Sequence, residues 1–187
     1  NYMHTFNVDD HYEIAKTLAA FGAFTEGVQL FASFAMLLNF PRFGKMLGMG
    51  QIITLSARDE TLHTLSIIRL YKEFINEYRS SIDLPKLKLE LVEIANKIIS
   101  MEDKFIDLAF SLGPIQGLTP IEVKNYIRYL ADRRLLQLGI EPSFGVKKNP
   151  LPWMDEMLNS MEFASFFEQT PTEYSKATSQ GSWSDAF

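Results

Sequence analysis

The residues best suited to chemistry are Glu60 and His63, which stand three positions apart in a helical pattern. Residues at i and i+3 of a helix lie on one side, about 5 Å apart. A carboxylate and an imidazole at that spacing can together bind one metal ion. Glu26 lies in an apolar stretch one helix earlier. Because a buried carboxylate without a partner costs several kcal/mol at least, we interpret all three as metal ligands.

Each feature also has an ordinary explanation. A Glu-x-x-His pattern arises by chance in many helices, and Glu26 could be a buried acid satisfied by hydrogen bonds. The metal interpretation rests on finding both features on neighbouring long apolar helices. Dimetal carboxylate bundles take one Glu from each of two helices and one Glu-x-x-His from each of two others. This chain holds one of each kind.

The other histidines do not complete such a set. His4 and His11 have Asn1 and Val8 three positions before them, so no second Glu-x-x-His exists. We therefore predict that the chain carries about half of a dimetal ligand set and does not assemble the centre alone. The missing ligands would come from an N-terminal half, either as a separate polypeptide or in the uncut protein.

Helical spacing of apolar residues predicts an all-α chain of long helices with short connections, as in a helical bundle. Asp9 or Asp10 is predicted to cap the first helix, Pro41 to interrupt it, and Thr119 to cap the last long one. The expected helices cover residues 8–39 (one helix or two in series), 51–79, 86–112 and 120–138, with one further turn at 154–159.

The sequence divides near residue 162. Residues 1–162 are expected to form the bundle domain, with an irregular packed arm after Gly139. Residues 163–187 are polar with scattered aromatic side chains, and we expect a flexible tail.

Composition restricts the classes of function. The 187 residues contain no cysteine and have a formal net charge of −5. Thiolate metal sites are excluded, and nothing indicates a nucleic-acid surface. Residues 18–40 are long and apolar enough to span a bilayer, which takes about 20 residues. A carboxylate in mid-span is costly in lipid, so Glu26 favours the buried centre of a bundle instead.

Longer stretches of sequence then carry a resemblance to a known family. EGVQLFASFAMLLNF, followed by GQIITLSARDETLH, resembles the paired metal-ligand helices of the class I ribonucleotide reductase small subunit. IRYLADRRLLQLGI and KKNPLPWMDEML are similar to that family's late helix and arm, and FFEQTPTEYSKATSQGSW to its C-terminal tail. The resemblance runs from about Leu18 to the end and implies the C-terminal half of a ferritin-like bundle.

The resemblance also implies a function. In that family a dimetal centre reacts with oxygen and usually oxidises a nearby tyrosine, so the small subunit generates and stores a radical. The radical passes to a cysteine of the large subunit, where ribonucleotides are reduced to deoxyribonucleotides. The expected cofactor is two Fe, two Mn or a mixed pair. The expected protein is a cytoplasmic homodimer.

Residue roles carry over where the motifs match. Glu26, Glu60 and His63 match the metal ligands, and Asp59 matches the acid that orients a ligating histidine and relays the radical. An apolar pocket around the metals and the radical is matched by Leu30, Phe34 and Ile53.

In the tail, Tyr174 matches the tyrosine that passes the radical between subunits, and Glu168 an acid of the same step. Residues 183–187 match the segment that docks the large subunit. The family's other ligands and its radical tyrosine precede the matching region and are not found here.

Three alternatives remain open. One is a related dimetal oxidase that has no reductase partner and needs neither Tyr174 nor a docking tail. Another is a non-catalytic helical interaction module in which Glu26 and Glu60 pair with arginines. The third is an inactive remnant of the family that only binds the large subunit.

Overall fold

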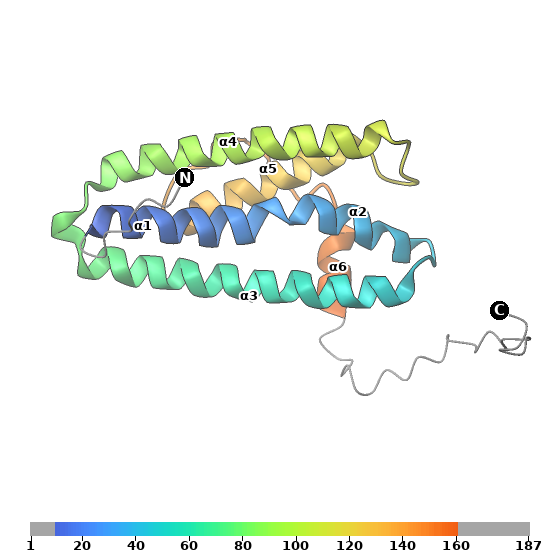
Figure 1. The fold of residues 1–187 in the computed structure, drawn as a ribbon, viewed down its shortest axis with the longest axis horizontal. Coiled ribbons are helices and arrows are strands. Elements are labelled where there is room, and N and C mark those ends of the chain that lie inside the picture. The colour runs from blue at the N-terminus through green and yellow to red at the C-terminus, as the bar shows by residue number, and fades with distance from the viewer. Residues whose placement is uncertain (1–9, 161–187) are drawn as a thin grey trace, which may run out of the picture.

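The computed structural model describes residues 10–160, and all regular structure in that range is helical (Figure 1). This confirms the predicted all-α class. The one β-type pairing in the described range is an isolated bridge between Ile115 and Leu118. The helices are α1 (His11–Ala19), the π-helix η1 (Ala20–Gln29), α2 (Phe31–Arg42), α3 (Leu47–Glu77), the 3₁₀ turn η2 (Arg79–Ser81), α4 (Leu84–Ser111), α5 (Pro120–Gln137) and α6 (Pro152–Ser160).

The elements α1, η1 and α2 form one continuous rod. It begins after Asp10, whose carboxylate accepts a hydrogen bond from the Glu13 backbone N–H at 3.1 Å. It continues through Pro41 to Arg42, so the prediction that Pro41 interrupts the helix was wrong. Proline lies here in the last turn, so the hydrogen bond that it removes and the bend that it causes affect only the end of the helix. The carbonyl of Pro41 accepts the N–H of Gly44 as the chain turns away.

The remaining helices lie close to their predicted positions. The helix α3 begins at Leu47 rather than residue 51 and ends at Glu77 rather than residue 79. The helix α4 begins at Leu84 because Asp83 caps it by accepting the Lys86 N–H at 3.1 Å. The helix α5 starts as predicted, with a reciprocal capping box between Thr119 and Glu122. Such boundaries depend on cap geometry more than on periodicity.

The rod of α1, η1 and α2 lies at the centre of the described bundle. It packs against α3 on one side and against α4 and α5 on the other (Figure 1). Close packing against α3 depends on glycine: a Cβ on Gly22 would lie 2.5 Å from Cγ2 of Ile67. The rod, His11–Arg42, is long and apolar enough to cross a membrane, but most of its most apolar stretch is buried in the bundle. It therefore serves as a core helix here.

The arm after α5 is held by one carboxylate. Asp132 accepts hydrogen bonds from the backbone N–H groups of Ser143, Phe144 and Val146 at 2.9, 2.9 and 3.0 Å. The arm then leads into α6, where the Trp153 ring lies 4.2 Å from the Arg42 guanidinium carbon. The domain boundary predicted near residue 162, and the tail beyond it, lie outside the described residues.

Candidate metal centre

Glu26, Glu60 and His63 converge at one point between two helices. Glu26 comes from η1, and the other two lie one helical turn apart on α3. One ligand atom from each lies within 4.8 Å of the other two. His63 Nδ1 is 3.4 Å from Glu60 Oε2 and 3.6 Å from Glu26 Oε2. The structure thus brings together the three residues that the sequence predicted as ligands.

The Glu26 carboxylate affects the charge of Glu60. The pKa of Glu60 is raised, chiefly by hydrogen bonding with the Glu26 carboxylate, then by burial and by the negative charge of Glu26. The His63 imidazole acts in the opposite direction. Two carboxylates this close disfavour simultaneous ionisation unless a cation lies between them. A divalent metal bound by both oxygens would supply that charge, so the donor set fits a hard or borderline metal ion.

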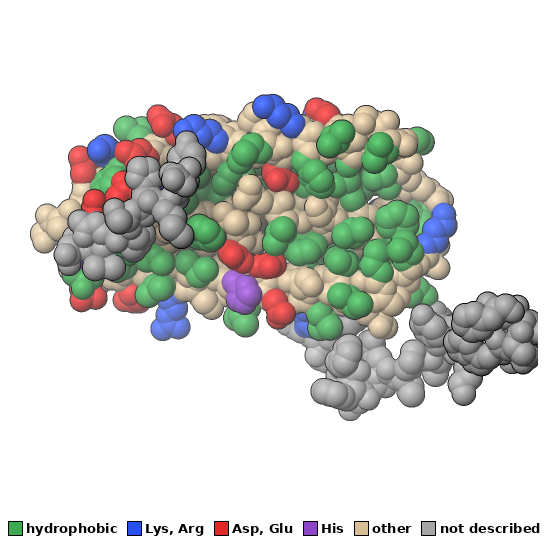
Figure 2. Space-filling model, viewed as in Figure 1, with side chains coloured by type: hydrophobic (Ala, Val, Ile, Leu, Met, Phe, Trp, Pro, Cys, Tyr) green, Lys and Arg blue, Asp and Glu red, His purple; other side chains and the backbone are tan. Residues whose placement is uncertain are grey.

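The cluster is open on one side. The side chains of Glu26 and Glu60 are 25 % and 21 % exposed, and that of His63 is 57 % exposed. Figure 2 shows these acidic and imidazole groups at the middle of one face of the bundle, with hydrophobic side chains around them. A metal bound here by three protein groups would need further ligands from that open side.

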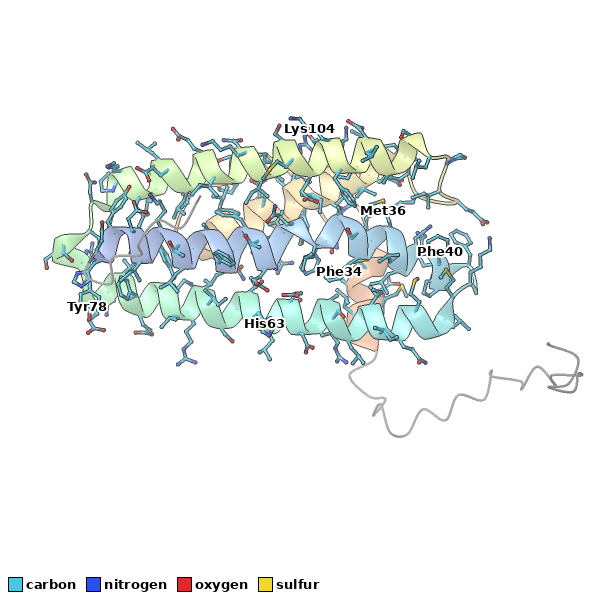
Figure 3. All side chains as sticks on the ribbon, in the orientation of Figure 1. Phe34, Met36, Phe40, His63, Tyr78 and Lys104 are labelled. Carbon is cyan, nitrogen blue, oxygen red and sulfur yellow. The ribbon has the colours of Figure 1, made fainter. Side chains whose placement is uncertain are left out.

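The predicted apolar pocket is only partly formed. Phe34 is 7 % exposed, Ile53 is partly buried and Leu30 is 40 % exposed. Figure 3 places Phe34 on α2 and His63 on α3, both near the middle of the bundle's length. Phe34 and Ile53 thus pack into the bundle, while Leu30 stands at its surface beside η1.

Glu26 is presented by a π-helix rather than an α-helix. The segment η1 runs from Ala20 to Gln29, and the backbone returns to the α form at Phe31. A π segment inserts extra backbone into a helix, and such segments are frequently found at functional sites. It changes the direction in which Glu26 points relative to a regular helix. Nothing in the periodicity of the sequence predicted this change of helix type.

Asp59 lies next to Glu60 on α3 but faces solvent. Within residues 10–160, no hydrogen bond or ion pair joins it to His63, whose Nδ1 faces the two glutamates. Its predicted role in orienting a ligating histidine stays a prediction. Tyr174 and Glu168 lie outside the described residues.

Sequence reasoning missed three residues behind the cluster: Gly27, Thr64 and Arg134. Arg134 of α5 is buried, and its Nε donates to the Gly27 carbonyl at 3.3 Å. Thr64 is fully buried next to His63. One signal was present: Arg134 follows Ile127 and Leu130 at helical spacing, so an arginine stands on the apolar face of its helix.

Comparisons with known proteins are consistent with this geometry. The family model described as "Ribonucleotide reductase, small chain" matches residues 1–150. A ribonucleoside-diphosphate reductase small subunit of Invertebrate iridescent virus 3 is 50 % identical over 184 residues, covering 98 % of this chain and 49 % of that protein. One from Invertebrate iridescent virus 6 is 40 % identical over 201 residues, covering 95 % of this chain and 56 % of that protein.

Among solved structures, one described as a class I ribonucleotide reductase from Bacillus halodurans superimposes with a TM-score of 0.69 at 26 % identity. The match covers 74 % of this chain and 49 % of that one. The fold is therefore the ferritin-like helical fold of those proteins. The chain spans about half the length of the curated relatives that it matches.

Proposed function

The chain belongs to the ribonucleotide reductase small-chain family, and on that premise we propose that it is the C-terminal half of a ribonucleoside-diphosphate reductase small subunit. The completed subunit generates and stores a radical at a dimetal carboxylate site. It passes that radical to the large subunit, which reduces ribonucleotides to deoxyribonucleotides. The observation that carries the proposal is the convergence of Glu26, Glu60 and His63 within 4.8 Å.

The three side chains have different roles in binding metal. Glu26 and Glu60 bring two carboxylates to one point, where they neutralise the charge of the bound cations. His63 offers Nδ1, the ring nitrogen that already faces both carboxylates. When bound, the pair of Fe or Mn ions supplies the oxidising equivalent. Phe34 and Ile53 keep water from the inner side of the site, which protects an oxidant from quenching.

The rest of the centre comes from polypeptide outside these residues. Two glutamates and one histidine are about half of the ligands expected for two metals. The open side of the ligand cluster faces solvent and is surrounded by exposed hydrophobic side chains (Figure 2). A second set of helices could cover such a surface. We assign that place to the N-terminal half of the small subunit. The completed subunit is expected to be a homodimer in the cytoplasm.

Transfer of the radical is assigned to three further residues and the end of the chain. Asp59 stands beside the metal ligand Glu60, and Glu168 and Tyr174 belong to the tail. Residues 183–187 dock the large subunit by folding against it. This assignment follows the resemblance of the tail to the family's tail sequence.

The test is metal content and an oxygen-dependent radical signal, measured by electron paramagnetic resonance. The chain is purified alone and again with the matching N-terminal half. We expect stoichiometric Fe or Mn and a radical only in the mixture, and their loss in Glu26→Gln and His63→Ala. Glu73→Gln, an exposed glutamate also on α3, is the matched control and should retain both.

Two results would contradict the proposal. Stoichiometric binding of two metals by the isolated chain would remove the need for a second half. Absence of metal from both samples would favour the inactive remnant or the interaction module. The module alternative expects arginine partners for the glutamates, whereas in residues 10–160 the structure pairs both with His63.

A further inference from the structure

Arg134 is an unusual residue for the interior of this bundle. It lies on α5 and is only 6 % exposed. Within residues 10–160 no carboxylate forms an ion pair with it; its guanidinium donates to the Gly27 carbonyl at 3.3 Å and to Gln137 Oε1 at 3.0 Å. Burial and the nearby Arg133 lower its pKa to about 10. Burying a charge without a counter-charge costs free energy. An arginine at position 134 therefore needs an explanation other than core packing.

Two residues near Arg134 are sequence neighbours of the metal ligands. Gly27 follows Glu26 in η1, and Thr64 follows His63 in α3. A Cβ on Gly27 would lie 2.6 Å from Arg134 Nε and 3.0 Å from Thr64 Cγ2. The arginine therefore occupies the space that a side chain at position 27 would need. Three elements meet at the back of the cluster: η1, α3 and α5.

The backbone that Arg134 contacts is the π-helix. A π-helix is less favourable than an α-helix and persists where surrounding structure supports it. The Gly27 carbonyl lies within this segment and accepts the Arg134 Nε–H from another helix. This hydrogen bond comes from outside the segment, at the residue next to Glu26.

We infer that Arg134 is a positioning residue for the metal centre: its bond to the Gly27 carbonyl holds η1 in the π form and so directs Glu26 toward Glu60 and His63. This inference rests on the proposed function for its consequence in metal binding. The geometry of η1 is a property of the metal-free chain and can be measured separately.

The test replaces Arg134 by methionine, which has similar length and no charge, in the full 187-residue chain. Removing a buried unpaired charge should leave the melting temperature unchanged or raised. Amide hydrogen exchange in residues 26–34 should nevertheless accelerate by about tenfold or more, because the π segment loses its outside support. Affinity for cobalt(II) of the chain mixed with the N-terminal half, read from visible absorption, should fall about 10- to 100-fold, as for other residues that orient ligands.

Arg133→Met is the matched control, because Arg133 is exposed on the same helix and contacts Tyr129. It should change neither exchange in η1 nor cobalt affinity. A folded Arg134→Met chain with unchanged exchange in η1 would overturn the inference. If Arg134→Met does not fold, Arg134→Leu is tested in its place: it also lacks an N–H donor, so unchanged exchange in a folded Arg134→Leu chain overturns the inference equally.

Failure of the proposed metal function and failure of the positioning role of Arg134 give different results. If the wild-type chain mixed with the N-terminal half binds no cobalt, the proposed metal function fails, while exchange in η1 still decides the role of Arg134. If cobalt binds equally well to wild type and to folded Arg134→Met, the metal site stands and the positioning role does not.

Discussion

Two carboxyl groups have raised pKa values for different reasons. The pKa of Glu60 is raised first by the adjoining Glu26 carboxylate. A metal ion bound by both carboxylates would remove the repulsion between them. The pKa of Glu102 is raised to about 7, first by burial and then by the negative charge of Asp103. Glu102 is 7 % exposed, and its Oε2 has no hydrogen-bond partner among the described residues. It behaves as a buried acid that prefers to stay protonated.

Glu102 predicts a specific dependence of stability on pH. Between pH 4.5 and about 7 the folded chain keeps a proton on Glu102 that the unfolded chain releases. The free energy of unfolding should therefore fall as pH rises through this window, by on the order of 3 kcal/mol at 1.36 kcal/mol per pKa unit. Glu102→Gln should remove this contribution. Urea unfolding at pH 5, 6 and 8 measures it.

The control for this prediction is Glu93→Gln, because Glu93 is exposed on the same helix. It should retain the wild-type pH dependence. Equal slopes for wild type and Glu102→Gln would show that Glu102 does not hold the proton.

At the scale of elements, the close approach of α2 and α3 near their connection depends on one glycine. A Cβ on Gly50 would lie 2.3 Å from Cγ of Pro41, whereas a Cβ on Gly48 would meet nothing within 4 Å. Both glycines belong to α3. The pair therefore separates the effect of helix propensity from the effect of packing.

Gly50→Ala should destabilise the chain by about 1–3 kcal/mol, because the new methyl group overlaps the proline ring. Gly48→Ala should be neutral or stabilising by up to about 1 kcal/mol, since alanine favours helix. Chemical denaturation of both variants gives the two values. Similar changes for both substitutions would argue against tight packing at Pro41.

A second element depends on Asp132, which holds the arm through three backbone N–H groups. Asp132→Ala should cost about 2–4 kcal/mol, because hydrogen bonds to a charged group are lost together. Amide exchange at Ser143, Phe144 and Val146 should rise well above that of α4. Asp107→Ala, which removes an exposed carboxylate paired with Lys124, should change stability by less than about 1 kcal/mol.

At the scale of the whole molecule, the bundle exposes many large hydrophobic side chains, and contiguous exposed patches of this kind mark interaction surfaces. Three exposed residues of α4 and its C-cap follow one another at helical spacing: Met101, Phe105, Leu108 and Leu112. Others, including Phe21 and Ile52, lie on the rod and on α3. Hydrophobic patches cover much of the face that carries the metal ligands (Figure 2).

We therefore predict that the isolated chain binds a hydrophobic dye and self-associates in sedimentation experiments. Adding the N-terminal half should reduce both effects, because it covers the face with the metal ligands. Heat-denatured N-terminal half serves as the control and should not reduce them. A monomeric isolated chain that leaves dye fluorescence unchanged would contradict the prediction.

The sequence alone determined what depends on neighbouring positions along one helix. The spacing of Glu60 and His63 places them on one side of α3, and the capping box at Thr119 places the start of α5, since both follow from local helix geometry. The long helices and the family resemblance were also readable, because apolar periodicity and extended motifs are properties of the chain itself.

Only the tertiary structure decided what depends on contacts between helices. The distance from Glu26 to the α3 pair, the π form of η1 and the approach of Arg134 to Gly27 each require several elements to be packed together. The Pro41 ring, inside the last turn of the rod, packs against Gly50, where there is no side chain to obstruct it. Such features depend on interactions between residues far apart in sequence, which periodicity and capping patterns along a single helix do not encode.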